Sequence, residues 1–290
     1  MTDKTVWRLF FYVLWATVAC TEEFIVNDVG NRDDTETKDT HSPPVDTNNN
    51  PRGCDLNTAD GAPVNTKVDL VLAVDNSAGM EAETVMVHTE LPILFSNLTQ
   101  QGIDMHVILI AASTPADDGK IKNGICLEAP MGSGQCPDDT NLPKYLHIEQ
   151  NIGSKDALTV FEKTRDTWRP AIRPDSQVHL MVVSDDDANM DAASFMSQMD
   201  ALTPPLNTFY FHAIGASVDK AIACASNPPL ACCETAAKEG IAYKDLAQQT
   251  DGLFYDLCEQ NFASAFEELD SFIMQRVCGE DMLPEAPISE

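Results

Sequence analysis

One stretch, VDLVLAVDNS at residues 68–77, decides the fold of this chain. Its first seven residues are apolar except for Asp69, which is the pattern of a strand buried on both faces of a parallel β-sheet. Asp75, Asn76 and Ser77 follow directly, where such a strand ends. Parallel sheets bind ligands beyond the carboxyl ends of their strands, so these three polar residues are the first candidates for a functional site.

Strand and helix patterns alternate along the rest of the chain. Further apolar runs predict strands near residues 103–112, 178–183, 208–214 and 253–255. Apolar residues at helical spacing predict helices near residues 81–101, 154–168, 191–202, 241–250 and 262–277. This alternation predicts one α/β domain of Rossmann-like, three-layer α/β/α architecture with a mostly parallel central sheet.

Three local features accompany these elements. Pro92 is expected to kink or restart the first helix, because proline removes a helical hydrogen bond. Ser154 is expected to cap the second helix at its N-terminus. Residues 113–150 are rich in Gly, Pro and Asp, and we predict that they form a long irregular insertion.

Composition narrows the range of functions. The 290 residues include 46 Asp and Glu against 18 Lys and Arg, a formal net charge of −28. Nucleic-acid binding needs a basic face, so this balance excludes that class. It also excludes attachment to a membrane surface through a polybasic patch. Apolar residues make up 43% of the chain, which is enough for an ordinary globular core.

The N-terminal residues have the pattern of a secretory leader. Lys4 and Arg8 precede an apolar run at residues 9–16, and small residues follow it. The run is too short for a membrane-spanning helix, which needs about 20 apolar residues. We therefore expect the chain to be exported, with residues 1–19 as its signal peptide.

The end of this leader resembles a bacterial lipobox. Val18 and Ala19 stand directly before Cys20, and in lipoproteins that cysteine is lipidated and becomes the first mature residue. Thr17 departs from the family, which usually has Leu there. The resemblance implies a lipid anchor on Cys20, and Thr21 in place of Asp favours the outer membrane. Ordinary signal cleavage near Ala19 is the alternative.

Composition also divides the mature chain. Residues 20–62 are polar and acidic, with little apolar surface to offset the entropy of ordering, so they are predicted to be a flexible tether. Residues 63–278 carry the strand and helix patterns and are predicted to form the folded domain. Residues 279–290 are interpreted as an acidic C-terminal tail.

Nine cysteines in an exported chain predict disulfides. With Cys20 lipidated, eight remain, an even number that allows 105 pairings. We expect one local bridge between Cys126 and Cys136, and a second between Cys54 and Cys278 that joins the ends of the domain. The other four would share two bonds: Cys224, Cys232, Cys233 and Cys258. A zinc site is the competing interpretation. It is disfavoured because Cys232 and Cys233 are adjacent, without the two-residue gap of a zinc motif, and because no histidine lies nearby at ligand spacing.

Oxygen-bearing side chains gather at the predicted ligand-binding edge of the sheet. They are Asp75 and Ser77 after the first strand, Ser154 before the second helix, and Asp185 after the third strand. Mixed carboxylate and hydroxyl ligands from separate loops suit a hard divalent cation such as Mg²⁺. Because Mg²⁺ keeps several waters, one face of the ion stays open to a ligand from a partner.

These residues resemble the metal-ion-dependent adhesion site (MIDAS) of a von Willebrand factor A (vWA) domain. The family pattern is Asp-x-Ser-x-Ser, a later Thr or Ser, and a distal Asp. Carried over by position, the matching residues are Asp75, Ser77, Ser154 and Asp185. Residues 153–158 are also similar to a run in secreted, cysteine-containing A-domain lipoproteins of Gram-negative bacteria. The resemblance implies a bound Mg²⁺, or Mn²⁺ or Ca²⁺ in its place.

The motif departs from the family at its third position, Gly79, which has no hydroxyl. A water in that place would make metal binding weaker, and Asp186 or Asp187 would add compensating charge. The alternative is a degenerate site kept as a turn, with Asp75 capping the next helix. The acidic cluster favours a cation, because its carboxylates repel one another without one.

The resemblance covers about residues 68–278 and implies a binding module rather than an enzyme. We expect metal-dependent binding of a protein or other carboxylate-bearing ligand at the cell envelope, in adhesion or envelope assembly. A disulfide-stabilised scaffold with an empty site is a weaker alternative.

A metal-dependent hydrolase is the alternative from another class. Asp75 or Asp185 would then handle phosphate or activate water. An aspartyl phosphoryl-transfer enzyme usually has a second Asp two residues after the first, where Ser77 stands, and no matched acid–base pair is evident. Four histidines are predicted to be packed or on the surface rather than catalytic: His88, His106, His179 and His212.

Overall fold

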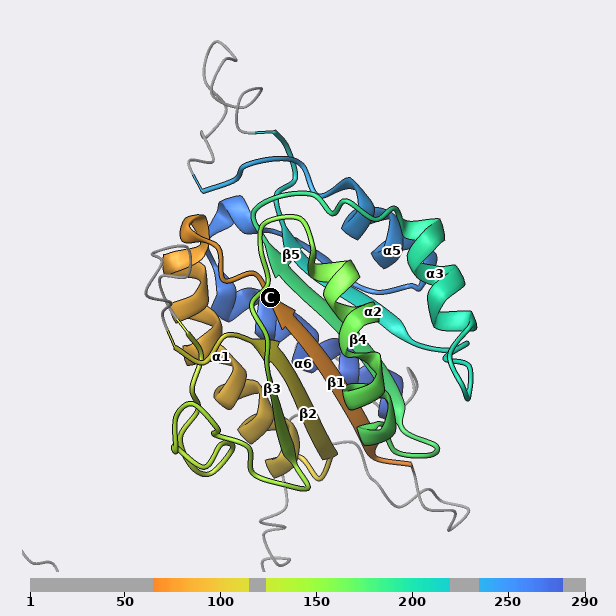
Figure 1. Cartoon of the computed structure of the whole chain (residues 1–290). Coiled ribbons are helices and arrows are strands. Elements are labelled where there is room, and N and C mark those ends of the chain that lie inside the picture. The colour runs from red at the N-terminus through yellow and green to blue at the C-terminus, as the bar shows by residue number, and fades with distance from the viewer. Residues whose placement is uncertain (1–64, 115–123, 220–234, 279–290) are drawn as a thin grey trace, which may run out of the picture. The chain divides into compact units, whose positions relative to one another are not determined.

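The central sheet consists of parallel strands (Figure 1). The computed structural model describes residues 65–114, 124–219 and 235–278, which all belong to one compact unit, Asn49–Glu290. Within these residues six strands pair in the order β3-β2-β1-β4-β5-β6, and each neighbouring pair is parallel. The strands are β1 Lys67–Val74, β2 Asp104–Ala111, β3 Tyr145–Glu149, β4 Gln177–Ser184, β5 Tyr210–Gly215 and β6 Phe254–Asp256.

Helices cover both faces of the sheet. On one face lie α1 Glu81–Gln100 and α6 Phe262–Cys278; on the other lie α2 Ala157–Trp168, α3 Ala192–Asp200 and α5 Ile241–Gln249. Short 3₁₀ helices are η1 Ala78–Met80, η2 Arg169–Ala171 and η3 Leu257–Glu259. Successive residues of β1 enter opposite cores, with Leu70 and Leu72 on the α1–α6 side and Val71 and Ala73 on the other. The predicted α/β architecture with a parallel central sheet is confirmed.

The strand order reverses next to β1. The chain builds β1, β2 and β3 outward in one direction, then returns through α2 to β4 on the other side of β1. In doubly wound sheets this reversal marks the place where ligands bind, at the carboxyl ends of the two strands concerned. Asp75 follows β1 and Asp185 follows β4, so the topology brings both predicted ligands to this switch point.

The irregular insertion predicted for residues 113–150 contains a strand. β3 pairs with β2, and its residues alternate between buried positions, Tyr145 and His147, and half-buried ones, Leu146 and Ile148. β3 lies at the edge of the sheet and is covered less completely than β1. Its sequence therefore lacks the continuous apolar run of a central strand, and the prediction missed it.

The predicted cap of the second helix is wrong, and one of the two predicted effects of Pro92 is absent. Asp156, not Ser154, is the N-cap residue of α2, and its Oδ1 accepts a hydrogen bond from the Gly153 N–H at 2.7 Å. Pro92 does not restart α1, which is one helix from its first residue to its last. Leu91 and Leu94 on either side of the proline are buried in the core, and this packing holds the helix together although one backbone hydrogen bond is lost.

The predicted disulfide between Cys126 and Cys136 is present, with 5.9 Å between the two Cα atoms. Cys258 and Cys278 are also disulfide-bonded. Their predicted partners lie outside the described residues, and so do the predicted signal peptide, the predicted lipidation site Cys20, the predicted tether and the predicted C-terminal tail. No helix in the described part of the chain is long and apolar enough to cross a membrane.

Asp69, the one charged residue of the apolar run at residues 68–74, is fully buried and paired with Arg173. Arg173 Nε donates to Asp69 Oδ1 at 2.8 Å, and its backbone N–H donates to Oδ2 at 2.7 Å. Ser176 Oγ also donates to Oδ2, at 2.6 Å, and Arg173 Nη1 pairs with Asp104 at 2.6 Å. The buried carboxylate at the amino end of β1 is therefore fully compensated by the chain itself.

We predict that Arg173→Ala lowers the free energy of unfolding by about 3–5 kcal/mol, because it leaves Asp69 buried without its cation. Urea denaturation would measure the change. Arg165→Ala is the matched control, since Arg165 is 47% exposed and pairs with Glu162 on the surface of α2. That variant should lose less than about 1 kcal/mol. Equal losses for the two arginines would contradict the prediction.

Candidate metal centre

The loop after β1 is held by backbone contacts to its neighbours. The Asp75 N–H donates to Val183 O and the Asn76 N–H donates to Ile152 O, each at 2.9 Å. Asn76 Oδ1 accepts a hydrogen bond from the Ala112 N–H at 2.7 Å, which ties the loop to the end of β2. The polar residues of the opening motif are thus fixed between three neighbouring segments rather than free on the surface.

Asp75 lies at the centre of the candidate site and is fully buried. Its Oδ1 accepts a hydrogen bond from the Ser77 N–H at 2.8 Å, and its Oδ2 accepts one from Ser184 Oγ at 2.9 Å. Ser184 Oγ also lies 3.4 Å from the backbone oxygen of Ser154. The structure therefore brings the loops that carry Asp75, Ser77 and Ser154 together around Ser184, and the contact of Ser154 is made through its backbone.

Asp185 approaches the same loop from the end of β4. It is only 6% exposed, and its carboxylate lies against Gly79. Its backbone oxygen accepts hydrogen bonds from the N–H groups of Ala237 at 2.7 Å and Lys238 at 3.2 Å. The main chain of Asp185 is thereby anchored, while its side chain is directed toward the motif after β1.

Several buried polar atoms here have no hydrogen-bond partner. Two are the predicted ligand atoms Ser77 Oγ and Asp185 Oδ1, and two more are Asn76 Nδ2 and Glu83 Oε2. Buried polar groups are nearly always paired, so a group of orphaned oxygens in one place needs an explanation. A divalent cation is a fitting partner for Ser77 Oγ and Asp185 Oδ1, since both are hard oxygen ligands.

Burial, with a smaller contribution from nearby negative charges, raises the pKa values of both aspartates. Desolvation raises the pKa of Asp75 to about 6, against hydrogen bonds from Ser77 and Ser184 that lower it. Desolvation also raises the pKa of Asp185 to about 7, and the negative charges of Asp75, Asp186 and Glu83 add to that rise. The site is therefore short of positive charge, which a proton or a metal ion would supply.

Glu83 and Ser184 belong to this region but are not among the predicted ligands. Glu83 is fully buried in the first turn of α1, and its Oε1 accepts a hydrogen bond from Gln260 Nε2 at 2.9 Å. A signal for it was present, because Glu83 precedes the buried Val87 and Leu91 at four-residue spacing and so shares their face. Nothing in the sequence marked Ser184 as the hydroxyl that bonds Asp75.

Asp186 and Asp187, which are predicted to add compensating charge near Gly79, bond to other groups, although the negative charge of Asp186 still contributes to the raised pKa of Asp185. Asp186 pairs with Lys155 at 3.5 Å, and Asp187 Oδ1 accepts hydrogen bonds from the Ala188 and Ala242 N–H groups at 2.9 Å each. Among the described residues, no three His, Cys, Asp or Glu side chains are grouped to hold a metal ion. A cation site here would thus depend on hydroxyl oxygens beside its two carboxylates, Asp75 and Asp185.

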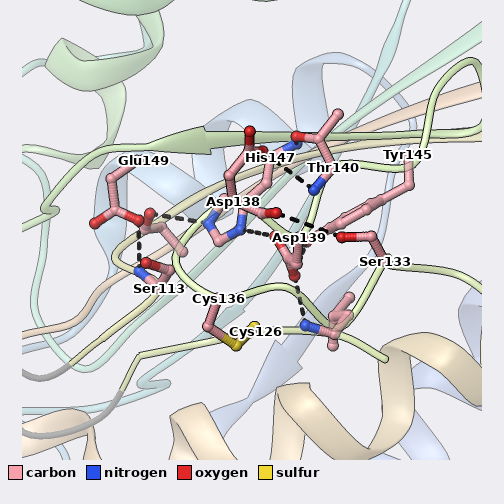
Figure 2. Close-up of polar contacts among 12 residues, drawn as sticks. Ser113, Cys126, Ser133, Cys136, Asp138, Asp139, Thr140, Tyr145, His147 and Glu149 are labelled. Carbon is pink, nitrogen blue, oxygen red and sulfur yellow. Dashed lines mark hydrogen bonds and ion pairs between the residues drawn. A yellow bond between two sulfur atoms is a disulfide. The ribbon is translucent and has the colours of Figure 1, made fainter. Parts of the chain in front are cut away.

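A second polar cluster lies beside the disulfide loop (Figure 2). His147 Nδ1 contacts Asp139 Oδ1, and its Nε2 lies 3.2 Å from Ala111 O. Asp139 Oδ2 accepts hydrogen bonds from Tyr145 Oη at 3.1 Å and from the Leu127 N–H. Both ring nitrogens of His147 and both carboxylate oxygens of Asp139 have hydrogen-bond partners. This cluster therefore attaches the disulfide loop to β2 and β3.

The electrostatics of Asp139 differ from those of Asp75. Burial raises the pKa of Asp139, but hydrogen bonds from His147, Leu127 and Tyr145 outweigh it and leave the pKa below the ordinary value.

Sequence analysis did not single out His147. Two of the histidines it did consider, His179 and His212, are packed in the core with 3.0 Å between Nδ1 and Nε2.

No protein-family model matches the chain, and no curated protein matches it. The fold defines a doubly wound α/β domain whose switch point carries Asp75 and Asp185.

The raised pKa values predict how the stability of the metal-free protein depends on pH. Between about pH 4 and pH 7 the folded state binds more protons at Asp75 and Asp185 than the unfolded state, whose carboxyl groups keep ordinary values near 3.8. The free energy of unfolding contributed by these groups therefore falls as pH rises through this window.

We predict that Asp185→Asn, which removes one of the repelling charges, raises the melting temperature of the chelator-treated protein at pH 8 by about 2–4 °C. At pH 5, where Asp185 already carries a proton, the variant should melt close to the wild type. Calorimetry at both pH values would measure this. A difference between the two proteins that does not change with pH would contradict the electrostatic account.

Proposed function

We propose that this chain is a cell-envelope lipoprotein whose vWA-like domain binds its partner through a divalent metal ion. The proposed ligands are Asp75, Ser77, Ser154 and Asp185, and Mg²⁺, Mn²⁺ or Ca²⁺ is the ion. The observation that carries this proposal is the pair of buried, unpartnered oxygens, Ser77 Oγ and Asp185 Oδ1, beside the buried carboxylate of Asp75.

Each residue has a distinct part in this proposal. Asp75 is held by the Ser77 N–H and by Ser184 Oγ, so its carboxylate is preorganised before the ion arrives. Asp185 and Ser77 supply the orphaned oxygens, and Ser154 supplies the hydroxyl implied by the family resemblance. The bound ion would neutralise the two carboxylates and offer an open coordination position to a carboxylate of the partner.

Location at the envelope is supported by the leader pattern and by the oxidised cysteines. The Cys126–Cys136 bridge, with Cys258 and Cys278 also oxidised, fits a chain that folds in an oxidising compartment. A lipid on Cys20 would attach the domain to the outer membrane, and residues 20–62 would separate it from the lipid surface. The strongly acidic composition suits a partner held through a cation better than one held by direct contact with phosphate.

We predict that the purified chain binds Mg²⁺, Mn²⁺ or Ca²⁺ and that Asp75→Ala abolishes binding, because the buried centre of the ligand set is lost. Titration calorimetry with each ion would measure the affinity. Asp166→Ala is the matched control, since the Asp166 side chain is 96% exposed on α2 and its removal changes the net charge equally. Loss of binding in both variants, or in neither, would count against the site.

A second prediction concerns the partner. Envelope proteins retained by the immobilised chain in Mg²⁺ should be released by a chelator and should not be retained by Asp75→Ala, because the ion forms the bridge. Retention that is unaffected by both treatments would argue against metal-dependent binding.

The hydrolase alternative makes a different prediction, which the same variants test. Metal-dependent turnover of a generic phosphoester, lost in Asp75→Asn, would favour an enzyme over a binding module. We expect no such turnover.

A further inference from the structure

The absent hydroxyl at Gly79 is the feature of the motif that the proposed function leaves unexplained. Gly79 lies in η1 and is exposed to solvent. Its φ is not in the left-handed region, unlike those of Gly102 and Gly134, so its backbone conformation is open to any residue. The reason for a glycine must therefore lie in the space around its Cα atom.

That space is occupied by Asp185. A Cβ atom built on Gly79 would lie 2.5 Å from Asp185 Oδ2 and 3.5 Å from its Cγ. The first distance is shorter than any normal non-bonded contact, so a side chain at position 79 and the Asp185 carboxylate cannot keep these positions together. Because the Asp185 backbone oxygen is held by the Ala237 and Lys238 N–H groups, the carboxylate is the part that would have to move.

The two oxygens of Asp185 face different surroundings. Oδ2 lies close to the position that a Cβ atom of residue 79 would take, and Oδ1 is buried without a hydrogen-bond partner. Within the described residues, no lysine or arginine forms an ion pair with Asp185. The Asp185 carboxylate thus lies beside the third position of the motif, where the family pattern has a hydroxyl.

We propose that Gly79 is a positioning residue that seats the Asp185 carboxylate as a direct ligand of the metal ion, in place of the missing serine. This inference rests on the proposed function. The motif then loses the serine hydroxyl but gains a metal ligand, because the space without a side chain at position 79 admits a carboxylate oxygen of Asp185. Restoring the family residue by Gly79→Ser would displace Asp185 and weaken metal binding.

The test compares metal affinities of the full chain by titration calorimetry with Mg²⁺, Mn²⁺ and Ca²⁺. We expect Gly79→Ser and Gly79→Ala to bind at least about tenfold more weakly than the wild type, the effect usual for misplacing a metal ligand. Ala78→Ser is the control, because Ala78 is the exposed neighbour in the same 3₁₀ helix and should bind as the wild type does. Unchanged or tighter binding by Gly79→Ser would overturn the inference.

A measurement without metal tests whether Gly79 makes room for the Asp185 carboxylate. Alanine at an unstrained glycine normally raises the melting temperature, because it restricts the unfolded chain. We expect Gly79→Ala to lower the melting temperature in chelator when Asp185 is present, and not to lower it in an Asp185→Ala background, where no carboxylate meets the new Cβ atom. Equal effects in the two backgrounds would show that Gly79 does not position the Asp185 carboxylate.

The outcomes separate this inference from the proposed function. If the wild type binds none of the three ions, the proposed function fails and the ligand role of Asp185 fails with it, while the melting experiment still decides whether Gly79 seats the carboxylate. If the wild type binds an ion and Gly79→Ser binds it equally well, the metal site stands and only the inference about Gly79 is rejected.

Discussion

The burial of the Asp75 carboxylate at the end of β1 is the constraint on which the ligand-binding edge of this domain depends. β1 lies between β2 and β4 at the reversal of strand order, so a residue directly after it is enclosed by loops from both sides. Ser77 and Ser184 hydrogen-bond its two oxygens but bring no positive charge. Asp185 then adds a second negative charge, and the raised pKa values of both groups reflect this lack of compensation.

A comparison of Asp139 with Asp185 shows why orphaned atoms are more informative than acidity alone. Asp139 has a partner for each of its oxygens, including His147 and Tyr145, and its pKa is lowered. Asp185 has an unpartnered Oδ1, and its pKa is raised. The first arrangement stabilises the disulfide loop as it stands, whereas the second stores electrostatic repulsion that a bound cation would relieve.

The sequence predicted those parts of the structure that depend on local pattern. Continuous apolar runs marked the central strands, and the polar residues after them, Asp75 and Asp185, were placed correctly at the switch point because parallel topology brings strand ends together. The edge strand β3 was missed because it lacks such a run. Ser184 and the contact between Gly79 and Asp185 were not predictable, since both depend on how two loops distant in sequence pack against each other.

A buried aspartate lies near each end of β1, Asp69 within the strand and Asp75 directly after it, and the two differ in how their charge is compensated. Asp69 and Asp75 are both fully buried. At the amino end, Arg173 of the same chain compensates the charge of Asp69, so no ion from solution is needed there. At the carboxyl end, no lysine or arginine of the described residues forms an ion pair with Asp75. The uncompensated charge of Asp75 therefore lowers the stability of the fold. A cation that binds there from solution would restore this stability.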